Sequence, residues 1–365
     1  MTKTTKIVIG IIVAIIVVGG IWWFGSQTPN EKSVIKIGSI VPLTGKIAFL
    51  GQPFQKGMEQ AVNEINAKGG VNGQRIELVT EDSKGDPTEG VTIANKFVSR
   101  GDITSVVVYS TAVSAAVASV FDENKIPFIA HGADTGLPLE HPYAFKTFYN
   151  SYDECKKLFN YTSSTKNMQK FGLLLPKVPW GEWCYKGVEE LAGKENIVDL
   201  TYNLGETDFR TLLLKAKQKD VDGLVWVSFR PESEAINKQK AELDIKIPLL
   251  CGYKMNCVSD KSLSEVPPEY LEGYIVFDFT LAESFKKEYK DEDIIDAAFG
   301  YEAIQLIASA LEKCEKIDKT CLYKQLPLVK NYSSVLNSNG FDDTKNLILN
   351  TSLFEVKNKN FVPIQ

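Results

Sequence analysis

The sequence predicts an α/β protein built from two doubly wound parallel sheets. Two observations support this fold class. Short apolar runs alternate with segments of helical periodicity along the chain, which is typical of βαβ units and parallel strands. The alternation occurs in two successive sets, and a chain of 365 residues is long enough for two domains of about 150 residues each.

The first set of units begins after residue 33. Four apolar runs predict strands, at residues 34–41, 75–82, 103–110 and 126–132. The segments between them predict helices, at residues 55–68, 87–100 and 114–124. Gly69 and Gly70 follow the first helix as a stop signal, and Asp86 precedes Pro87 as the N-cap of the second.

The second set repeats the pattern. Its predicted strands lie at residues 171–176, 197–203, 223–229, 247–253 and 274–279. Its predicted helices lie at residues 181–194, 209–219 and 231–243, with a long helical stretch at about 284–315. The final segment, residues 352–364, predicts a hairpin. In sheets of this kind, ligands bind at the carboxyl ends of the strands.

The N-terminus differs in composition from the rest of the chain. Residues 7–25 carry no charge and, at about 20 residues, are long enough to span a bilayer. Lys3 and Lys6 precede this run and favour the cytoplasmic side, so the rest of the chain is expected outside. We expect residues 1–25 to be an uncleaved membrane anchor and residues 26–33 a polar linker. A cleaved signal peptide is the alternative.

Six cysteines follow the apolar segment, and an extracytoplasmic location favours disulfides. The spacing favours two bonds that close short loops, Cys251 with Cys257 and Cys314 with Cys321. Cys155 and Cys184 then remain for each other. Six cysteines allow 15 pairings, and buried free thiols are the alternative.

Several functional classes find no support in the sequence. The net charge is -5 and basic residues are scattered, which argues against nucleic-acid binding. No zinc-ligand spacing occurs, and the glycine-rich turn at residues 66–73 lacks the Gly-Lys-Ser/Thr ending of a phosphate loop. His131 is one of two histidines, with no Ser–His–Asp arrangement around it. We therefore expect no cofactor, no metal and no catalytic residues.

Polar residues follow two of the predicted strands. Ser110 and Thr111 stand between a buried strand and a helix, where hydroxyl and N–H groups suit an anion such as a carboxylate. Simple N-capping is the alternative. Gly132 and Asp134 end the next strand, and Asp134 could cap the following segment or meet a cation.

Residues 41–82 resemble the opening of the leucine/isoleucine/valine-binding protein family, which are type I periplasmic substrate-binding proteins of ABC transporters. The similarity continues at residues 86–98, 126–139 and 336–364. It implies two α/β lobes joined by three crossings, near residues 147–151, 277–281 and 335–340, with the ligand enclosed by hinge closure.

The lobes that the resemblance implies are each built from two segments. Lobe 1 comprises residues 34–147 plus 281–337, and lobe 2 comprises residues 148–280 plus 338–365.

The resemblance also implies ligand contacts. In the family, a hydroxyl residue at the position of Thr111, with Ser110 beside it, binds the amino-acid carboxylate. The carbonyl at Gly132 and a hydroxyl residue at Asp134 bind the ammonium. Leu50 occupies the place of an aromatic residue that covers the ligand.

Lobe 2 is expected to supply the remaining contacts. Trp180 matches a lid tyrosine, Phe229 or Arg230 matches a second tyrosine, and Lys254 matches a glutamate that pairs with the ammonium. Three of these positions depart from the family in charge: Asp134, Arg230 and Lys254.

Three interpretations of the departures are open. Asp134 could bind the ammonium while Arg230 or Lys254 holds an acidic side chain or other polar group. The ligand could instead not be an α-amino acid, with Lys254 meeting an anion. Alternatively, Arg230 and Lys254 point to solvent at the cleft rim and Asp134 is paired internally.

These observations predict a membrane-tethered, monomeric, extracytoplasmic solute-binding protein. It would deliver an amino acid or related small carboxylate to an ABC transporter permease and perform no chemistry. A ligand sensor that presents its closed state to a membrane receptor is the first alternative. An enzyme on the same scaffold is the second.

Overall fold

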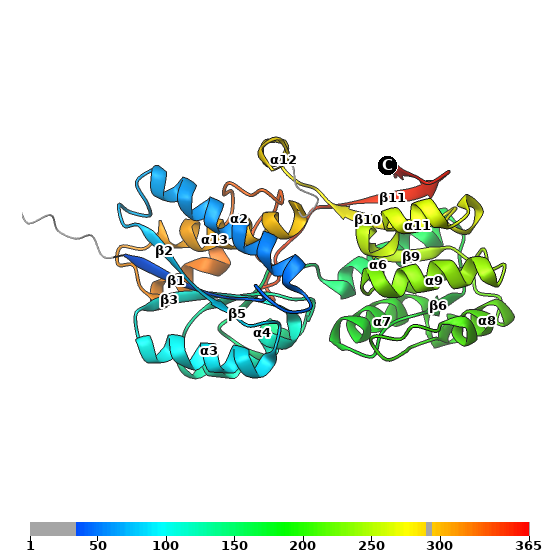
Figure 1. Ribbon diagram of the computed structural model, residues 1–365, viewed down its shortest axis with the longest axis horizontal. Coiled ribbons are helices and arrows are strands. Elements are labelled where there is room, and N and C mark those ends of the chain that lie inside the picture. The colour runs from blue at the N-terminus through cyan, green and yellow to red at the C-terminus, as the bar shows by residue number, and fades with distance from the viewer. Residues whose placement is uncertain (1–33, 290–293, 365) are drawn as a thin grey trace, which may run out of the picture.

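The computed structural model describes residues 34–289 and 294–364. Two α/β bodies lie side by side, each built around its own sheet (Figure 1). The first, mostly blue and cyan with orange helices, contains the N-terminal strands. The second, green to yellow with red strands, contains the C-terminal hairpin. The predicted membrane segment and linker, residues 1–33, lie outside the described residues.

The first sheet has five parallel strands in the order β2-β1-β3-β4-β5. The strands are β1 (Ile35–Val41), β2 (Ile76–Asp82), β3 (Ile103–Tyr109), β4 (Phe128–His131) and β5 (Ala144–Lys146). Helices α2 (Ala48–Ala67) and α13 (Ile294–Leu311) cover one face, and α3 (Pro87–Arg100) and α4 (Thr111–Glu123) cover the other (Figure 1).

The second sheet has seven strands in the order β12-β11-β10-β9-β8-β6-β7. Strands β6 to β10 are parallel, whereas β11 runs antiparallel to both β10 and β12. The bounds are β6 (Phe171–Leu173), β7 (Ile197–Asp199), β8 (Gly223–Trp226), β9 (Leu249–Tyr253), β10 (Ile275–Phe279), β11 (Thr351–Lys357) and β12 (Asn360–Pro363). The predicted parallel α/β fold and the C-terminal hairpin are therefore confirmed.

Helices cover both faces of the second sheet as well. On one face lie α6 (Ser151–Thr165) and α7 (Pro179–Ala192), and on the other α8 (Arg210–Gln218), α9 (Arg230–Glu242) and α11 (Asp260–Glu265). The remaining short helices are α5 (Leu137–Glu140), α10 (Lys254–Cys257), α12 (Glu283–Glu288), α14 (Lys319–Gln325), and the 3₁₀ turns η1 (Lys194–Asn196), η2 (Pro268–Tyr270) and η3 (Leu326–Leu328).

The predicted start of α3 is confirmed in detail. The Asp86 side chain accepts a hydrogen bond from the Glu89 N–H at 2.9 Å, and Pro87 occupies the first helical position. The predicted stretch at residues 284–315 is not one helix, because α12 ends at Glu288 and the backbone at Tyr289 is extended. Strand β5 and helix α6 were not predicted at all.

Disulfides join all six cysteines in the predicted pairs. Cys155 bonds Cys184 between α6 and α7, Cys251 bonds Cys257 across the end of β9, and Cys314 bonds Cys321 between α13 and α14. Within the described part of the chain, one helix, α13, is long and apolar enough to cross a membrane. However, 72% of its apolar window is buried, because α13 is a core helix of the first body.

Candidate functional site

A cavity of about 290 Å³ lies where the carboxyl ends of strands from both sheets face each other. The loops after β3 and β4 form one wall, and residues after β8 and β9 form another. This is the place where doubly wound sheets bind ligands. The lining residues are Ile47, Leu50, Tyr109, Ser110, Thr111, Ala112, His131, Gly132, Ala133, Phe148, Tyr149, Trp180, Ser228, Phe229, Tyr253, Asn256, Ile295 and Asp296.

The start of α4 brings polar groups to the cavity. Ser110 is the N-cap, and its side chain makes no capping hydrogen bond. The Thr111 hydroxyl accepts a hydrogen bond from the Ala133 N–H at 2.9 Å, which leaves its own proton to donate. The N–H groups of a first helical turn have no partner within the helix, so this end suits an anion.

The backbone at Ser110 is held in an unusual conformation, with φ of 94° and ψ of 133°. Such a conformation costs a non-glycine residue about 1–3 kcal/mol and is concentrated at functional sites. Two backbone hydrogen bonds hold it, from the Ser110 N–H to the His131 carbonyl and from the Ser114 N–H to the Ser110 carbonyl, both at 2.9 Å. The β3–α4 junction is therefore fixed by its neighbours.

Gly132 allows the loop after β4 to approach α4 closely. A Cβ atom at this position would lie 2.8 Å from the Cα and 3.0 Å from the hydroxyl oxygen of Thr111. Any larger residue would push the loop away from the helix start. The glycine thus sets the spacing between the Gly132 carbonyl and the α4 N-terminus.

The loop after β1 forms part of the rim. Asp82, at the end of β2, accepts hydrogen bonds from the Leu43 N–H and the Lys84 N–H, both at 2.8 Å, and from the Thr44 hydroxyl at 2.5 Å. Partial burial acts to raise the pKa of Asp82, but these hydrogen bonds outweigh it and lower the pKa. The ionised Asp82 side chain therefore holds in place the loop after β1, which leads to Ile47.

The wall from the second body is aromatic. The Trp180 and Phe229 rings meet edge to face with centroids 5.7 Å apart, and Tyr253 lies at the end of β9. Cys251 and Cys257 form a disulfide that closes the short loop containing Tyr253 and Asn256. This wall offers apolar surface to a ligand, with the Ser228 hydroxyl and the Asn256 amide as polar groups.

His131 lies in the floor of the cavity among aromatic rings. Its ring centroid is 4.7–4.9 Å from those of Phe54, Tyr109, Phe148 and Phe299. Burial, with a smaller contribution from the charge of Lys146, lowers the pKa of His131 from 6.5 to about 3. The imidazole is therefore neutral at physiological pH and contributes no charge to the cavity.

Asp296 brings a carboxylate to the cavity from the first turn of α13. The Tyr109 hydroxyl donates a hydrogen bond to Asp296 Oδ1 at 2.8 Å. Tyr109 is itself buried, and burial followed by the charge of Asp296 raises its pKa well above the usual value. The tyrosine therefore stays protonated and acts as a hydrogen-bond donor to the carboxylate.

The comparison with known proteins decides the family. Residues 34–360 match the sequence profile of the family described as periplasmic binding protein. The chain belongs to the periplasmic binding protein family. This confirms the resemblance predicted from the sequence, and the two-sheet architecture is that of its type I fold.

Individual relatives agree with this family. The chain is 31% identical to Leu/Ile/Val-binding protein homolog 2 of Brucella abortus over 229 residues, a match that covers 60% of each chain. It is 25% identical to homolog 1 of the same organism over 350 residues, or 90% of each chain. A solved branched-chain amino acid transporter substrate binding protein from Streptococcus pneumoniae, in complex with isoleucine, superposes with a TM-score of 0.75. Its sequence is 24% identical, and the match covers 91% of this chain and 99% of that one.

In this periplasmic binding protein, six of the nine residues predicted to bind ligand line the cavity: Leu50, Ser110, Thr111, Gly132, Trp180 and Phe229. The other three lie elsewhere. Asp134 accepts a hydrogen bond from the Gly136 N–H at 3.0 Å and borders a separate surface hollow. Arg230 is exposed at the start of α9. Lys254 forms an ion pair with Asp278 and lies 5.5 Å from the ring centroids of Phe354 and Phe361.

Sequence reasoning missed several lining residues. Phe148 and Tyr149 follow β5, a strand that was not predicted, and Asp296 lies within a helix whose start was placed too early. The position of Tyr109 in the sequence indicates a lining residue, because it directly precedes Ser110 at the end of a predicted strand. The same applies to Tyr253, the last residue of β9.

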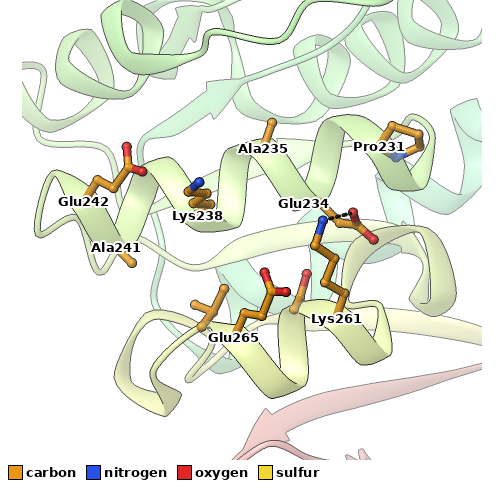
Figure 2. A pocket seen from close by; sticks show the side chains of 10 residues that line it. Pro231, Glu234, Ala235, Lys238, Ala241, Glu242, Lys261 and Glu265 are labelled. Atoms are coloured by element: carbon orange, nitrogen blue, oxygen red, sulfur yellow. Dashed lines mark ion pairs between the residues drawn. The ribbon is translucent and has the colours of Figure 1, made fainter.

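A second hollow, of about 440 Å³, lies between α9 and α11 on the second body (Figure 2). Glu234 of α9 faces Lys261 of α11 across it, with 3.4 Å between their charged atoms. Its walls are helix side chains of both charges rather than strand ends. We therefore assign ligand binding to the cavity between the sheets. Among the described residues, no group of three or more His, Cys, Asp or Glu side chains is arranged to hold a metal ion.

Proposed function

We propose that this chain is an extracytoplasmic solute-binding protein of an ABC importer. Its ligand is an amino acid or a related small carboxylate with an apolar side chain. The observation that carries the proposal is the cavity itself, in which the α4 N-terminus of one body faces the aromatic wall of the other. The streptococcal relative solved with isoleucine supports this choice of ligand class.

In the proposed complex, the carboxylate of the ligand lies at Ser110 and Thr111. The hydroxyl of Thr111 donates to it, since the oxygen already accepts from the Ala133 N–H. The side chain of the ligand packs against Trp180 and Phe229, with Leu50 covering it from the first body. Apolar burial supplies affinity, and the hydroxyl and N–H groups fix the orientation of the carboxylate.

The two lobes would close over the ligand by a hinge motion. We assign residues 34–147 plus 281–337 to lobe 1 and residues 148–280 plus 338–365 to lobe 2. The ligand stabilises the closed state because only that state lets both walls contact it, and the permease then recognises closed lobes. Three disulfides fit an oxidising location outside the cytoplasm, where residues 1–25 would anchor the chain.

A thermal-shift screen of the purified full-length protein tests the ligand class. The panel contains the common amino acids, dicarboxylates, amides and aromatic acids. A ligand at 100 times its Kd stabilises the folded state by about 2.7 kcal/mol, which raises the melting temperature measurably. If no carboxylate in the panel shifts the melting temperature, the proposed function is wrong.

Three further observations test lobe closure and separate the rival functions. A binding protein leaves its ligand unchanged, so prolonged incubation with the tightest ligand should yield no product; turnover would indicate an enzyme. Small-angle scattering with and without that ligand tests closure through the radius of gyration. Genes for a permease and an ATPase beside this gene favour transport, whereas a sensor kinase gene favours the receptor alternative.

A further inference from the structure

The geometry points to Asp296 as the partner of a cationic nitrogen on the ligand. This inference rests on the proposed function and narrows the ligand class to amino acids. It also assigns the recognition of both charged groups of the ligand to one lobe. The second lobe then contacts the side chain of the ligand.

The first observation concerns the charged residues among those that line the cavity. Among the described residues that line it, Asp296 is the single acidic side chain, and none is Lys or Arg. His131 is neutral, as its surroundings require. A carboxylate in the wall of the cavity complements a positive group on a ligand, and such complementarity contributes to selectivity.

The position of Asp296 is fixed by backbone packing. Helices α13 and α2 approach so closely that a Cβ at Gly57 would lie 1.9 Å from the Ala297 carbonyl oxygen. A Cβ at Gly300 would lie 2.0 Å from the Phe54 carbonyl oxygen. Two glycines therefore set the depth of the helix start that carries Asp296, one residue before Ala297.

Tyr109 links the carboxylate to the anion-binding end of the cavity. It donates to Asp296 Oδ1 at 2.8 Å, and its ring is held against Phe54 and His131 with centroids 5.0 and 4.9 Å away. Because Tyr109 is adjacent to Ser110 in the chain, Asp296 and the α4 N-terminus belong to the same small region. Their opposite preferences match the ammonium and carboxylate of one amino-acid head group.

The sequence-predicted amine partner differs from this one. Asp134 binds the Gly136 N–H and does not line the cavity, and Lys254 pairs with Asp278. The acidic group that lines the cavity comes instead from α13. The aromatic wall of Trp180, Phe229 and Tyr253 is left to contact the apolar side chain.

Calorimetric titration with three matched probes tests the inference on the full-length protein. L-leucine has both charged groups, 4-methyl-2-oxopentanoate lacks the amine, and 3-methylbutylamine lacks the carboxylate. The wild-type protein should bind leucine about 100-fold more tightly than the oxo acid. Asp296→Asn should remove most of this ratio by weakening leucine alone, as expected for a buried charge pair that loses one member.

The selectivity ratio is the readout that a merely structural role would not move. Tyr109→Phe should weaken leucine about tenfold with little effect on the oxo acid, since it removes the hydroxyl that holds Asp296. Glu312→Gln, which changes an exposed acid just beyond α13, is the matched control and should change neither. The melting temperature without ligand checks that each variant is folded.

Each outcome has a defined meaning. If Asp296→Asn binds leucine as tightly as the wild type, or weakens leucine and oxo acid equally, the inference is wrong while the proposed function stands. If wild type binds only the amine, and Asp296→Asn abolishes that, the inference stands and the proposed carboxylate-binding function is wrong. If no leucine-type probe binds, the same three-probe design is repeated with the amino acid that gives the largest thermal shift, and a proposed function without any such ligand is wrong.

Discussion

The hydroxyl of Thr111 accepts a hydrogen bond from the backbone N–H of Ala133 at 2.9 Å, which ties the first residue of α4 to the loop after β4. Both residues line the cavity. Because the oxygen already accepts this bond, the proton of the hydroxyl is left to donate to a ligand. Recognition of a carboxylate at this point is then built on a donor that needs little reorganisation.

Replacing Thr111 tests this arrangement. Thr111→Val keeps the shape of the side chain but removes both the acceptor for the Ala133 N–H and the donor to the ligand. A hydrogen bond to a charged group contributes about 1.5–3 kcal/mol, so the Kd for a carboxylate ligand should rise about 10-fold to 100-fold. Thr111→Ser is the control and should stay within a few fold. Calorimetric titration measures both, and equal affinity of Thr111→Val and wild type would contradict the role.

The backbone at Ser110 leads to a prediction in which stability and affinity move in opposite directions. Glycine adopts φ near 94° without strain, so Ser110→Gly should raise the free energy of unfolding of the ligand-free protein by about 1 kcal/mol. Ser110→Ala retains the strain and should not be stabilised. Both variants lose the hydroxyl and should bind a carboxylate more weakly. Denaturant unfolding and titration separate the two effects, and a destabilised Ser110→Gly would refute the strain argument.

The first body could be predicted from the sequence wherever several local signals agreed. Helix α3 begins at Pro87 and ends at Arg100, as the sequence predicted. Asp86 caps its start, and Gly101 ends it in the left-handed conformation. Ser110 and Thr111 were found because they directly follow a continuous apolar strand. Strand β5 could not be predicted from the pattern of apolar residues, because it has three residues, one of which is a lysine.

Lys146 shows why that strand was hidden. Its side chain is fully buried, with the ammonium group donating to the carbonyls of Phe148 and Tyr149 at 2.7 and 2.8 Å. Burial lowers its pKa to about 7, partly opposed by the charge of Asp134. No periodicity in the sequence signals a lysine that satisfies backbone carbonyls inside the protein.

In the second body, a difference of one position in the chain determines which side chains line the cavity. Tyr253 and Asn256 line it, whereas Lys254 turns toward Asp278 on β10. Residues three apart share a face at a helical turn and adjacent residues do not, so the short helix α10 separates them. An alignment to relatives points to the loop but does not resolve its local geometry.

The disulfide between Cys251 and Cys257 should matter for binding, whereas the one between Cys314 and Cys321 should not. The sequence separations are 6 and 7 residues, so loss of either cross-link should destabilise the fold by a similar amount. Only the first closes the loop that holds Tyr253 and Asn256. A Cys251→Ser/Cys257→Ser double variant should bind ligand about tenfold more weakly, because the freed loop must be ordered on binding.

Matched titrations of the two double variants measure this difference. Cys314→Ser/Cys321→Ser serves as the control for the general loss of a cross-link. If both double variants bind with wild-type affinity, the disulfide does not shape the cavity wall. If both weaken equally, the effect reflects global stability rather than the position of Tyr253.

The buried imidazole of His131 makes stability depend on pH. Its pKa is about 3 in the folded protein and 6.5 when exposed, so the unfolded chain binds the additional proton as pH falls below 6.5. Stability is therefore complete above pH 6.5 and is lost progressively toward pH 3. At pH 5 the loss from this one group is about 2 kcal/mol.

His131→Phe fits among Phe54, Phe148 and Phe299 and removes the titration. Urea unfolding without ligand at pH 7.5 and pH 5 should show the variant losing about 2 kcal/mol less than the wild type on acidification. His141 is present in both proteins and cancels in the comparison, so equal losses would mean that His131 does not titrate as its surroundings predict.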